Sequence, residues 1–171
     1  MSVLSRRENI LKILKDSKQA ISGTSLASEL NVSRQVIVGD VAILKAAGED
    51  IISTSKGYIL NDKKESEGYI LKSIACKHSK DCIEDELNSI VDEGATVINV
   101  MVEHYLYGQI TGDLYLSSRR DVKEFMEKLK SDIVNPLADL TDGIHLHTIK
   151  CRNEVSFNEI IKSLESKGYL L

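Results

Sequence analysis

A chain of 171 residues can form one large domain or two small ones. Its 22 lysine and arginine residues against 26 aspartate and glutamate residues give a formal net charge of -4, which excludes a protein that coats nucleic acid along its whole length. Residues 1–60 hold 8 basic and 6 acidic residues, whereas residues 61–171 hold 14 and 20, so any nucleic-acid contact is expected in the first third.

The sequence also bears on where the protein works. No run of about 18 consecutive apolar residues occurs, and the first residues, MSVLSRRENILKIL, interrupt their apolar side chains with charged ones. Three widely spaced cysteines do not form the even-numbered pattern of a disulfide framework. We therefore expect no membrane segment and no signal peptide, and a cytoplasmic location with reduced cysteines.

Three helices are predicted at the start of the chain. The first spans residues 5–16, where apolar residues recur at helical spacing and Ser5 and Glu8 form the sequence pattern of a capping box. Two more follow in SGTSLASELNVSRQVIVGDVAILKAAG, joined by a very short turn, and Thr24 and Ser33 are their expected N-caps. This spacing is typical of a helix-turn-helix motif.

The second helix of this motif is predicted to read double-stranded operator DNA. Its apolar residues can bury one face, which leaves the opposite face near the helix N-terminus for base edges in the major groove. The segment EDIISTSKGYIL then predicts a two-stranded wing whose turn can touch phosphate. The predicted DNA contacts are Ser33, Arg34, Gln35, Val38, Thr54, Ser55 and Lys56. The alternative, a three-helix module for protein contacts, is disfavoured by the wing and by the Arg-Gln pair.

A second domain is predicted after the polar segment NDKKESEG. We place a linker at residues 61–68, between a winged helix-turn-helix domain over residues 1–60 and a domain over residues 69–171. The elements predicted in this domain are strand, helix, strand, strand, helix, strand and helix, over residues 69–75, 81–93, 96–103, 109–116, 120–133, 144–150 and 156–167. This order is that of a split-βαβ fold, an antiparallel sheet with helices on one face, so the chain is of the α+β class.

Two of the four histidines lie in the last predicted strand, in the segment DGIHLHTIK. Side chains alternate along a strand, so His145 and His147 share one face and Ile144 and Leu146 share the other. Because the second pair is apolar, we expect Ile144 and Leu146 to face the helices.

A metal site can be assembled from these histidines. His78 follows the first strand of the second domain and Glu86 lies on its first helix, so the fold can bring both to His145 and His147. Three neutral imidazoles and one carboxylate suit zinc, nickel, iron or copper, and can leave positions open for water or a small ligand. The alternative is that the histidines lie on an exposed sheet face and that Glu86 is a solvated helix residue.

The combination resembles the niacin-responsive transcriptional repressors, whose regulatory part is called the 3H, or three-histidine, domain. The resemblance spans essentially the whole chain and is carried by SRQVIVGDVAILKAAGEDI, IACKHSKDCIEDEL, VEHYLYGQITGDLYLSSRRDV and DGIHLHTI. It implies that His78, Glu86, His145 and His147 bind a transition metal, with zinc or nickel favoured. It also implies that nicotinic acid is the effector, a co-repressor that promotes operator binding and shuts down NAD synthesis or niacin uptake.

Other polar residues of the second domain have more than one possible role. His104 is a further metal ligand, an effector contact or a loop residue, and an effector bound near it is expected to touch Tyr107 as well. The three cysteines, Cys76, Cys82 and Cys151, can each donate a thiolate. Buried free cysteine usually packs as a small hydrophobe, so we expect all three in the core.

We further expect a homodimer held by the second domain, because one recognition helix reads too few bases for a genomic site. We expect no enzymatic activity, because no motif places a general base beside the proposed ligands. Three rivals remain at this point: a repressor that senses the metal alone, a metalloenzyme fused to a DNA-binding module, and a domain that serves only for dimerisation.

Overall fold

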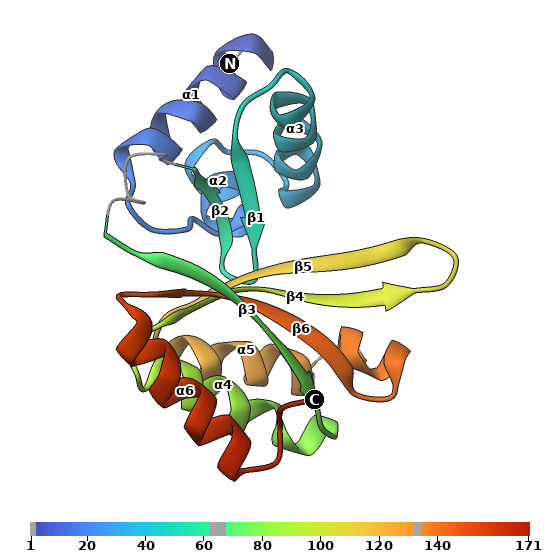
Figure 1. The fold of residues 1–171 in the computed structure, drawn as a ribbon. Coiled ribbons are helices and arrows are strands. Elements are labelled where there is room, and N and C mark those ends of the chain that lie inside the picture. The colour runs from blue at the N-terminus through green and yellow to red at the C-terminus, as the bar shows by residue number, and fades with distance from the viewer. Residues whose placement is uncertain (1–2, 62–67, 132–134) are drawn as a thin grey trace. The chain divides into compact units, whose positions relative to one another are not determined.

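The computed structural model describes residues 3–61, 68–131 and 135–171. The chain divides into two compact units, Met1–Glu65 and Ser66–Leu171 (Figure 1). Each unit has its own hydrophobic core. The predicted linker lies outside the described residues except for its first and last residue. Within the described parts of the chain, no helix combines the length and the apolar character needed to cross a membrane.

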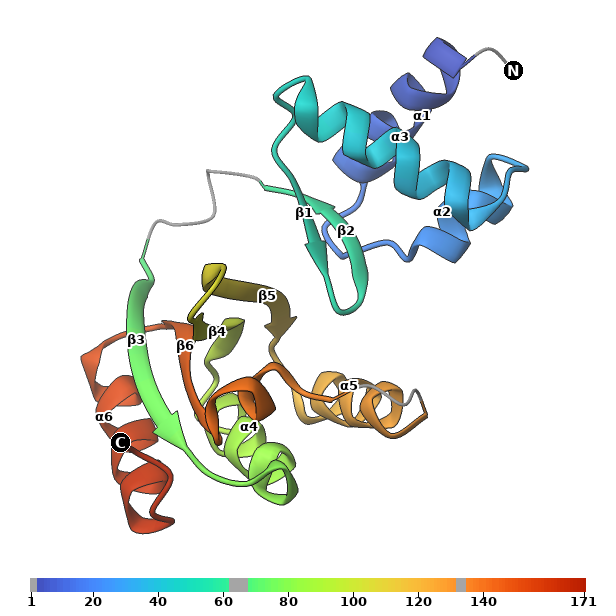
Figure 2. The same cartoon turned by 90° about the vertical axis from the view of Figure 1, so that its right-hand side faces the viewer.

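The N-terminal unit consists of three helices followed by a two-stranded antiparallel sheet (Figure 2). Its elements are α1 Val3–Asp16, α2 Gly23–Glu29, α3 Arg34–Ala46, β1 Ile51–Thr54 and β2 Gly57–Leu60. Apolar side chains from the three helices and from β1 form the core, in which Ile10, Leu26 and Ile37 are fully buried. The predicted helix-turn-helix with its wing is confirmed.

The helix caps differ from the prediction at two of three positions. Helix α1 begins at Val3, so Ser5 lies inside the helix and its predicted capping box is wrong. The N-cap of α2 is Ser22, which has an extended backbone and accepts a hydrogen bond from a backbone N–H of the first turn. Thr24 lies within that turn, where its backbone is helical, and therefore cannot serve as the cap. Ser33 caps α3 as predicted.

One face of α3 is buried and carries a single charged residue, Asp40. The predicted apolar residues of this face are buried, with Ile37 fully so, and Asp40 is only 3% exposed. Its carboxylate accepts hydrogen bonds from Nε of Arg6 at 2.5 Å and from Nε of Arg7 at 2.9 Å. Burial acts to raise the pKa of Asp40, but the bonds from both arginines outweigh it and lower the pKa. The pairs therefore join α1 to α3.

Asp40→Ala is expected to destabilise the N-terminal unit. The substitution removes the acceptor of both arginines and leaves a gap between α1 and α3. We expect the melting temperature of this unit to fall by roughly 4–8 °C, measured by circular dichroism. Asp16→Ala, at an exposed position at the end of α1, is the control and should leave the melting temperature unchanged. An equal fall in both variants would contradict the proposed role of the Asp40 pairs.

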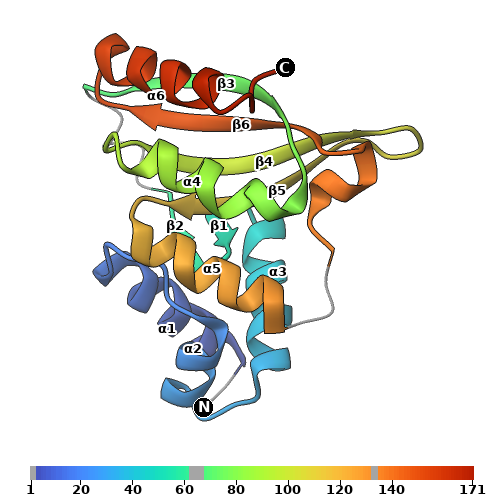
Figure 3. The same ribbon diagram turned by 90° about the horizontal axis from the view of Figure 1, so that it is seen from below.

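The C-terminal unit is a four-stranded antiparallel sheet with three helices on one face (Figures 1 and 3). Its elements are β3 Ile70–Lys77, the 3-10 turn η2 Lys80–Cys82, α4 Ile83–Val91, β4 Thr96–His104, β5 Gly108–Leu116, α5 Arg119–Ser131, the 3-10 turn η3 Leu137–Thr141, β6 Ile144–Cys151 and α6 Glu154–Ser166. The strand order is β3-β6-β4-β5. The predicted α+β class and the split-βαβ arrangement are confirmed, with β6 as the strand that separates β3 from β4.

The face of β6 that meets the helices is the opposite of the one predicted. His145, His147, Ile149 and Cys151 are buried, whereas Ile144 is exposed and Leu146 is half-buried. Ile149 and Cys151 belong to the hydrophobic core beneath the helices, and strand alternation then brings both histidines to the same side. The two residues at the end of the strand therefore decide which face is buried. The expectation that Ile144 and Leu146 face the helices is wrong.

Candidate metal centre

Glu86 lies at the centre of a buried cluster of three histidines. It sits on the face of α4 that contacts the sheet, where Ile83, Leu87 and Ile90 are also buried, and is only 1% exposed. The Nε2 atoms of His78, His145 and His147 lie 2.8, 3.2 and 3.5 Å from its carboxylate oxygens. All four side chains are at most 3% exposed. The structure thus brings together the four residues predicted as metal ligands, and the alternative of surface histidines does not describe it.

Backbone carbonyls orient all three imidazole rings. The Nδ1 atoms of His78, His145 and His147 lie 2.9, 2.8 and 2.6 Å from the carbonyl oxygens of Ser79, Gly143 and Asn99. A carbonyl oxygen can only accept, so each Nδ1 carries a proton. In the neutral ring the proton on Nδ1 leaves Nε2 with a lone pair, and all three Nε2 atoms are directed at Glu86. Histidines that ligate a metal are usually held in this way through their other nitrogen.

When its imidazole rings are neutral, the cluster has hydrogen-bond acceptors at its centre but too few hydrogen-bond donors. Nε2 of His78 is buried and makes no hydrogen bond of acceptable geometry, although it lies 2.8 Å from Oε2 of Glu86. Three nitrogen lone pairs and a carboxylate in a buried space require either protons or a cation between them. Their donor set of three nitrogens and one oxygen fits zinc, nickel and other borderline transition metals.

The ionisation of the cluster follows from the same contacts. Burial acts to lower the pKa of His78, but the Glu86 carboxylate outweighs it and the pKa is raised above its usual value. Burial would likewise raise the pKa of Glu86, yet the charge of His147 and the close contacts with the three imidazoles hold the pKa well below its usual value. Without a cation, the carboxylate therefore stays charged and favours a proton on His78.

The turn before β6 brings His78 to the other ligands. Gly143 has a positive φ of 84°, and a Cβ at this position would lie 2.2 Å from the carbonyl oxygen of His78. The carbonyl oxygen of Gly143 accepts from Nδ1 of His145 and, at 3.4 Å, from the backbone N–H of His78. One glycine thus positions two of the three histidines. The Asp-Gly pair was a turn signal in the sequence, but its role in the site was not predicted.

Gly143→Ala is expected to weaken metal binding by roughly 10- to 100-fold, which is the loss typical when a group that orients a metal ligand is changed. The new methyl group must displace the backbone at His78. Gly94→Ala is the matched control, because Gly94 also has a positive φ, of 73°, but nothing within 4 Å of its Cβ position. Competition titration with a metal-responsive dye measures both affinities. Similar losses in the two variants would assign the effect to backbone strain and not to the close approach to His78.

Cys76 adds a thiol to the cluster. It is fully buried on β3, and its sulfur lies with a Glu86 oxygen and a His145 nitrogen in a group whose atoms are all within 4.8 Å of one another. Burial and the neighbouring Glu86 carboxylate raise the pKa of the thiol. Cys76 and Cys151 both belong to the hydrophobic core, as predicted, whereas Cys82 is half-buried and outside it.

His104 and Tyr107 lie at the β4–β5 hairpin and not in the cluster. Val100 pairs with His147, and His104 follows four residues later, roughly 13 Å further along the strand. The His104 ring stacks on Tyr105 and Tyr107 at centroid distances of 5.2 and 5.0 Å, and its Nδ1 accepts from two backbone N–H groups of the turn. Tyr107 is 73% exposed. His104 therefore acts as a turn residue in this unit and is not brought to the four ligands.

The predicted DNA contacts divide between α3 and the wing. Ser33, Arg34, Gln35 and Val38 are all exposed around the N-terminus of α3. In the wing turn, the hydroxyl of Thr54 donates to the carbonyl oxygen of Gly57 and accepts from two backbone N–H groups. Ser55 and Lys56 form the turn itself and are half-buried. The hydroxyl of Thr54 thus holds the turn, and the exposed end of α3 offers the clearer DNA-binding surface.

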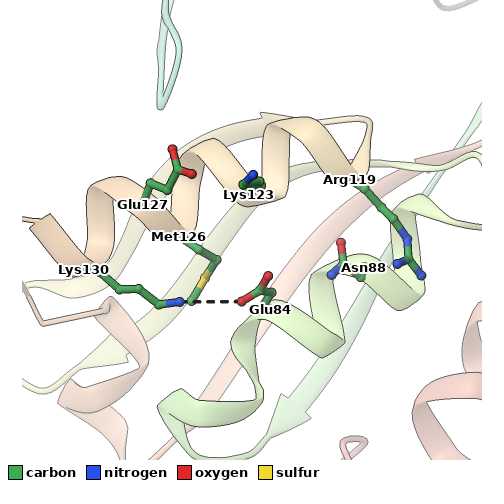
Figure 4. Close-up of a pocket in the computed structure, with 7 residues that line it drawn as sticks. All are labelled: Glu84, Asn88, Arg119, Lys123, Met126, Glu127 and Lys130. Carbon is green, nitrogen blue, oxygen red and sulfur yellow. Dashed lines mark ion pairs between the residues drawn. The ribbon is translucent and has the colours of Figure 1, made fainter.

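A separate cavity of about 330 Å³ lies between α4 and α5 (Figure 4). Its lining is mostly charged and consists of Glu84, Asn88, Arg119, Lys123, Met126, Glu127 and Lys130. Arg119 is already held by two hydrogen bonds of 2.6 Å to Asp92. None of the four cluster residues lines this cavity, so it is distinct from the candidate metal centre.

A winged helix-turn-helix joined to a second, α+β unit is the architecture of a DNA-binding regulator. Residues 6–59 match the model of an HTH domain, and residues 71–171 match the model of the 3H domain. The chain is 41% identical over 167 residues to "Transcription repressor NadR" of Bacillus subtilis, which covers 97% of this chain and 93% of that protein. It is 39% identical over 166 residues to "Probable transcription repressor NiaR" of Thermotoga maritima, with the same two coverages. The chain therefore belongs to the family of transcription repressors that combine an HTH domain with a 3H domain.

Proposed function

We propose that this protein is a metal-containing repressor whose operator binding is promoted by nicotinic acid, and that it controls genes of NAD biosynthesis or niacin uptake. The observation that carries the proposal is the buried set of three Nε2 lone pairs around Glu86, in a chain whose relatives are named transcription repressors. A cation accounts for this set better than an empty cluster does.

The metal would be held by His78, Glu86, His145 and His147, and zinc or nickel fits this donor set. When bound, the ion supplies a Lewis-acidic position that a pyridine nitrogen or a carboxylate oxygen of nicotinic acid can occupy. The carbonyl oxygens behind the rings keep the three nitrogens directed at one point, so the site is preorganised. His104 and Tyr107 are too far along the hairpin to touch such an effector from within the same unit.

In the proposed complex, Arg34 and Gln35 reach base edges in the major groove of the operator. Arg34 and Gln35 follow the Ser33 cap and are exposed, so neither has to leave a buried position to do so. A homodimer would place two such helices on a two-fold symmetric operator, and we propose that the C-terminal unit holds it together.

Operator binding by the purified protein, with its metal, tests the function directly. We expect nicotinic acid to tighten binding, nicotinamide to have less effect because it lacks the carboxylate, and a chelator to remove the response. Full tightening by the metal alone, with no further effect of nicotinic acid, would favour a metal-sensing repressor. Operator binding that ignores nicotinic acid, nicotinamide and chelator alike would contradict the proposal.

Arg34→Ala is expected to weaken operator binding by roughly 1–3 kcal/mol relative to random DNA, and to leave metal content unchanged. The arginine lies in the N-terminal unit, whereas all four cluster residues lie in the C-terminal one. Fluorescence anisotropy on both DNAs measures the change, with Arg152→Ala in the C-terminal unit as the control. Equal weakening on operator and random DNA would identify Arg34 as a phosphate contact and not a base contact.

A further inference from the structure

A buried thiol lies beside Glu86 and is a potential donor that the four proposed ligands leave out. Cys76 lies on β3 directly opposite His145 on β6, and both side chains point to the helix side of the sheet. The sulfur of Cys76, one oxygen of Glu86 and one nitrogen of His145 all lie within 4.8 Å of one another. The thiol therefore lies in one group with two of the four proposed ligands.

The sheet places the donors in two pairs. Cys76 and His78 are two residues apart along one chain segment, and His145 and His147 are two residues apart along the neighbouring strand. Alternation directs all four to the same side, where Glu86 faces them from α4. Cys76 occupies the position beside both His78 and His145.

A donor that brings a negative charge would balance the charge of a loaded site. A divalent ion with Glu86 and three neutral imidazoles leaves one uncompensated positive charge in a buried space, which is costly. The adjacent carboxylate, Asp85, cannot compensate it, because Lys167 is already paired with Asp85 at 2.8 Å. Among the described residues, Cys76 is a fully buried group within 4.8 Å of Glu86 and His145 that can supply one negative charge from the protein itself.

We infer that Cys76 is a fifth protein ligand of the metal centre, which makes the site a mixed sulfur, nitrogen and oxygen site. On binding, the S–H bond breaks, the proton leaves to solvent and a bond from sulfur to the ion forms, with no change of oxidation state. Such a donor set selects zinc and similar borderline ions over magnesium or calcium, which prefer oxygen ligands. The inference rests on the metal-binding part of the proposed function and names one more residue of that site.

X-ray absorption at the zinc edge of the wild-type protein tests the inference without any substitution. We expect one sulfur neighbour at about 2.3 Å in addition to nitrogen and oxygen neighbours at about 2.0–2.1 Å. A shell of nitrogen and oxygen alone would overturn the assignment of Cys76 and leave the four-ligand site intact. Failure to bind either zinc or nickel would overturn both assignments, whereas the response of operator binding to nicotinic acid is measured separately.

Cobalt-loaded variants identify which cysteine is the ligand. A thiolate bound to cobalt(II) gives a charge-transfer absorption in the near ultraviolet, which we expect in the wild type and not in Cys76→Ser. Cys151→Ser, at an equally buried position, and Cys82→Ser, at a half-buried one, are controls that should keep the band. A band that survives in Cys76→Ser, or disappears in either control, would show that Cys76 is not the ligand. The visible d–d bands report in each case that cobalt is bound.

Discussion

His145→Ala and His147→Ala are each expected to reduce bound zinc or nickel to a small fraction of the wild-type content, while Leu146→Ala keeps it. Both histidines bring Nε2 within 3.5 Å of Glu86, whereas Leu146 lies between them on the opposite face of β6. Substitution of a group that hydrogen-bonds to a metal ligand typically lowers metal affinity by roughly 10- to 100-fold, so loss of a ligand itself should lower it more. The effect should therefore alternate along three consecutive residues.

Metal content after dialysis, measured by mass spectrometry, checks this expectation. The two histidine variants should also lose the response to nicotinic acid and keep their basal affinity for the operator, because α3 lies in the other unit. Leu146→Ala controls for general damage to β6. If both histidine variants retain full metal and the full response to nicotinic acid, the cluster is not the metal centre.

The metal-loaded and the chelated protein are expected to change stability in opposite directions as the pH rises above the ordinary histidine pKa of about 6.5. In the chelated protein the pKa of His78 is raised, because the Glu86 carboxylate outweighs the effect of burial. The protonated pair then stabilises the folded state fully below the unfolded histidine pKa, near 6.5, and this contribution is lost as the pH rises through the folded value. Glu86 has a lowered pKa, so its contribution is lost only in more acidic solution.

In the metal-loaded protein, the change of stability with pH has the opposite sign. The ion requires unprotonated nitrogens, so the folded state binds fewer protons than the unfolded state, and stability rises as the pH increases through about 6.5. Melting temperatures of both forms at a series of pH values measure the two slopes. Parallel slopes would mean that the ion does not compete with protons on these histidines, and would exclude them as its ligands.

The identity of the four clustered residues could be predicted from the sequence, but the reason they cluster could not. The spacing of His145 and His147 predicts that they share one face of the strand, but it does not predict which face. The choice of face depends on Ile149 and Cys151, which fill the core at the far end of β6, and the pattern of Ile144 and Leu146 suggested the opposite. Short strands with apolar residues on both faces leave this choice to tertiary packing.

The groups that orient the rings were not predictable either. Three backbone carbonyls, at Ser79, Asn99 and Gly143, accept from the histidines, and a carbonyl is present at every residue. Asn99 lies at a register shift in β4, which changes the backbone direction there, and such bulges have no clear sequence signal. The N-cap of α2 was predicted two residues late for a simpler reason, since three hydroxyl residues lie at the start of that helix.

The central position of β6 has a consequence for how the protein is made. β3 and β4 each pair with β6, and no pairing between β3 and β4 exists in the described sheet. A growing chain that has emerged only as far as β5 can form the β4–β5 hairpin, but it lacks the strand that joins β3 to it. Non-local pairing of this kind is slow to form, because a long loop must close before any contact compensates for its lost entropy. His145 lies 59 residues after Glu86 in the chain, so an ion that binds both would stabilise the sheet only once β6 has joined it.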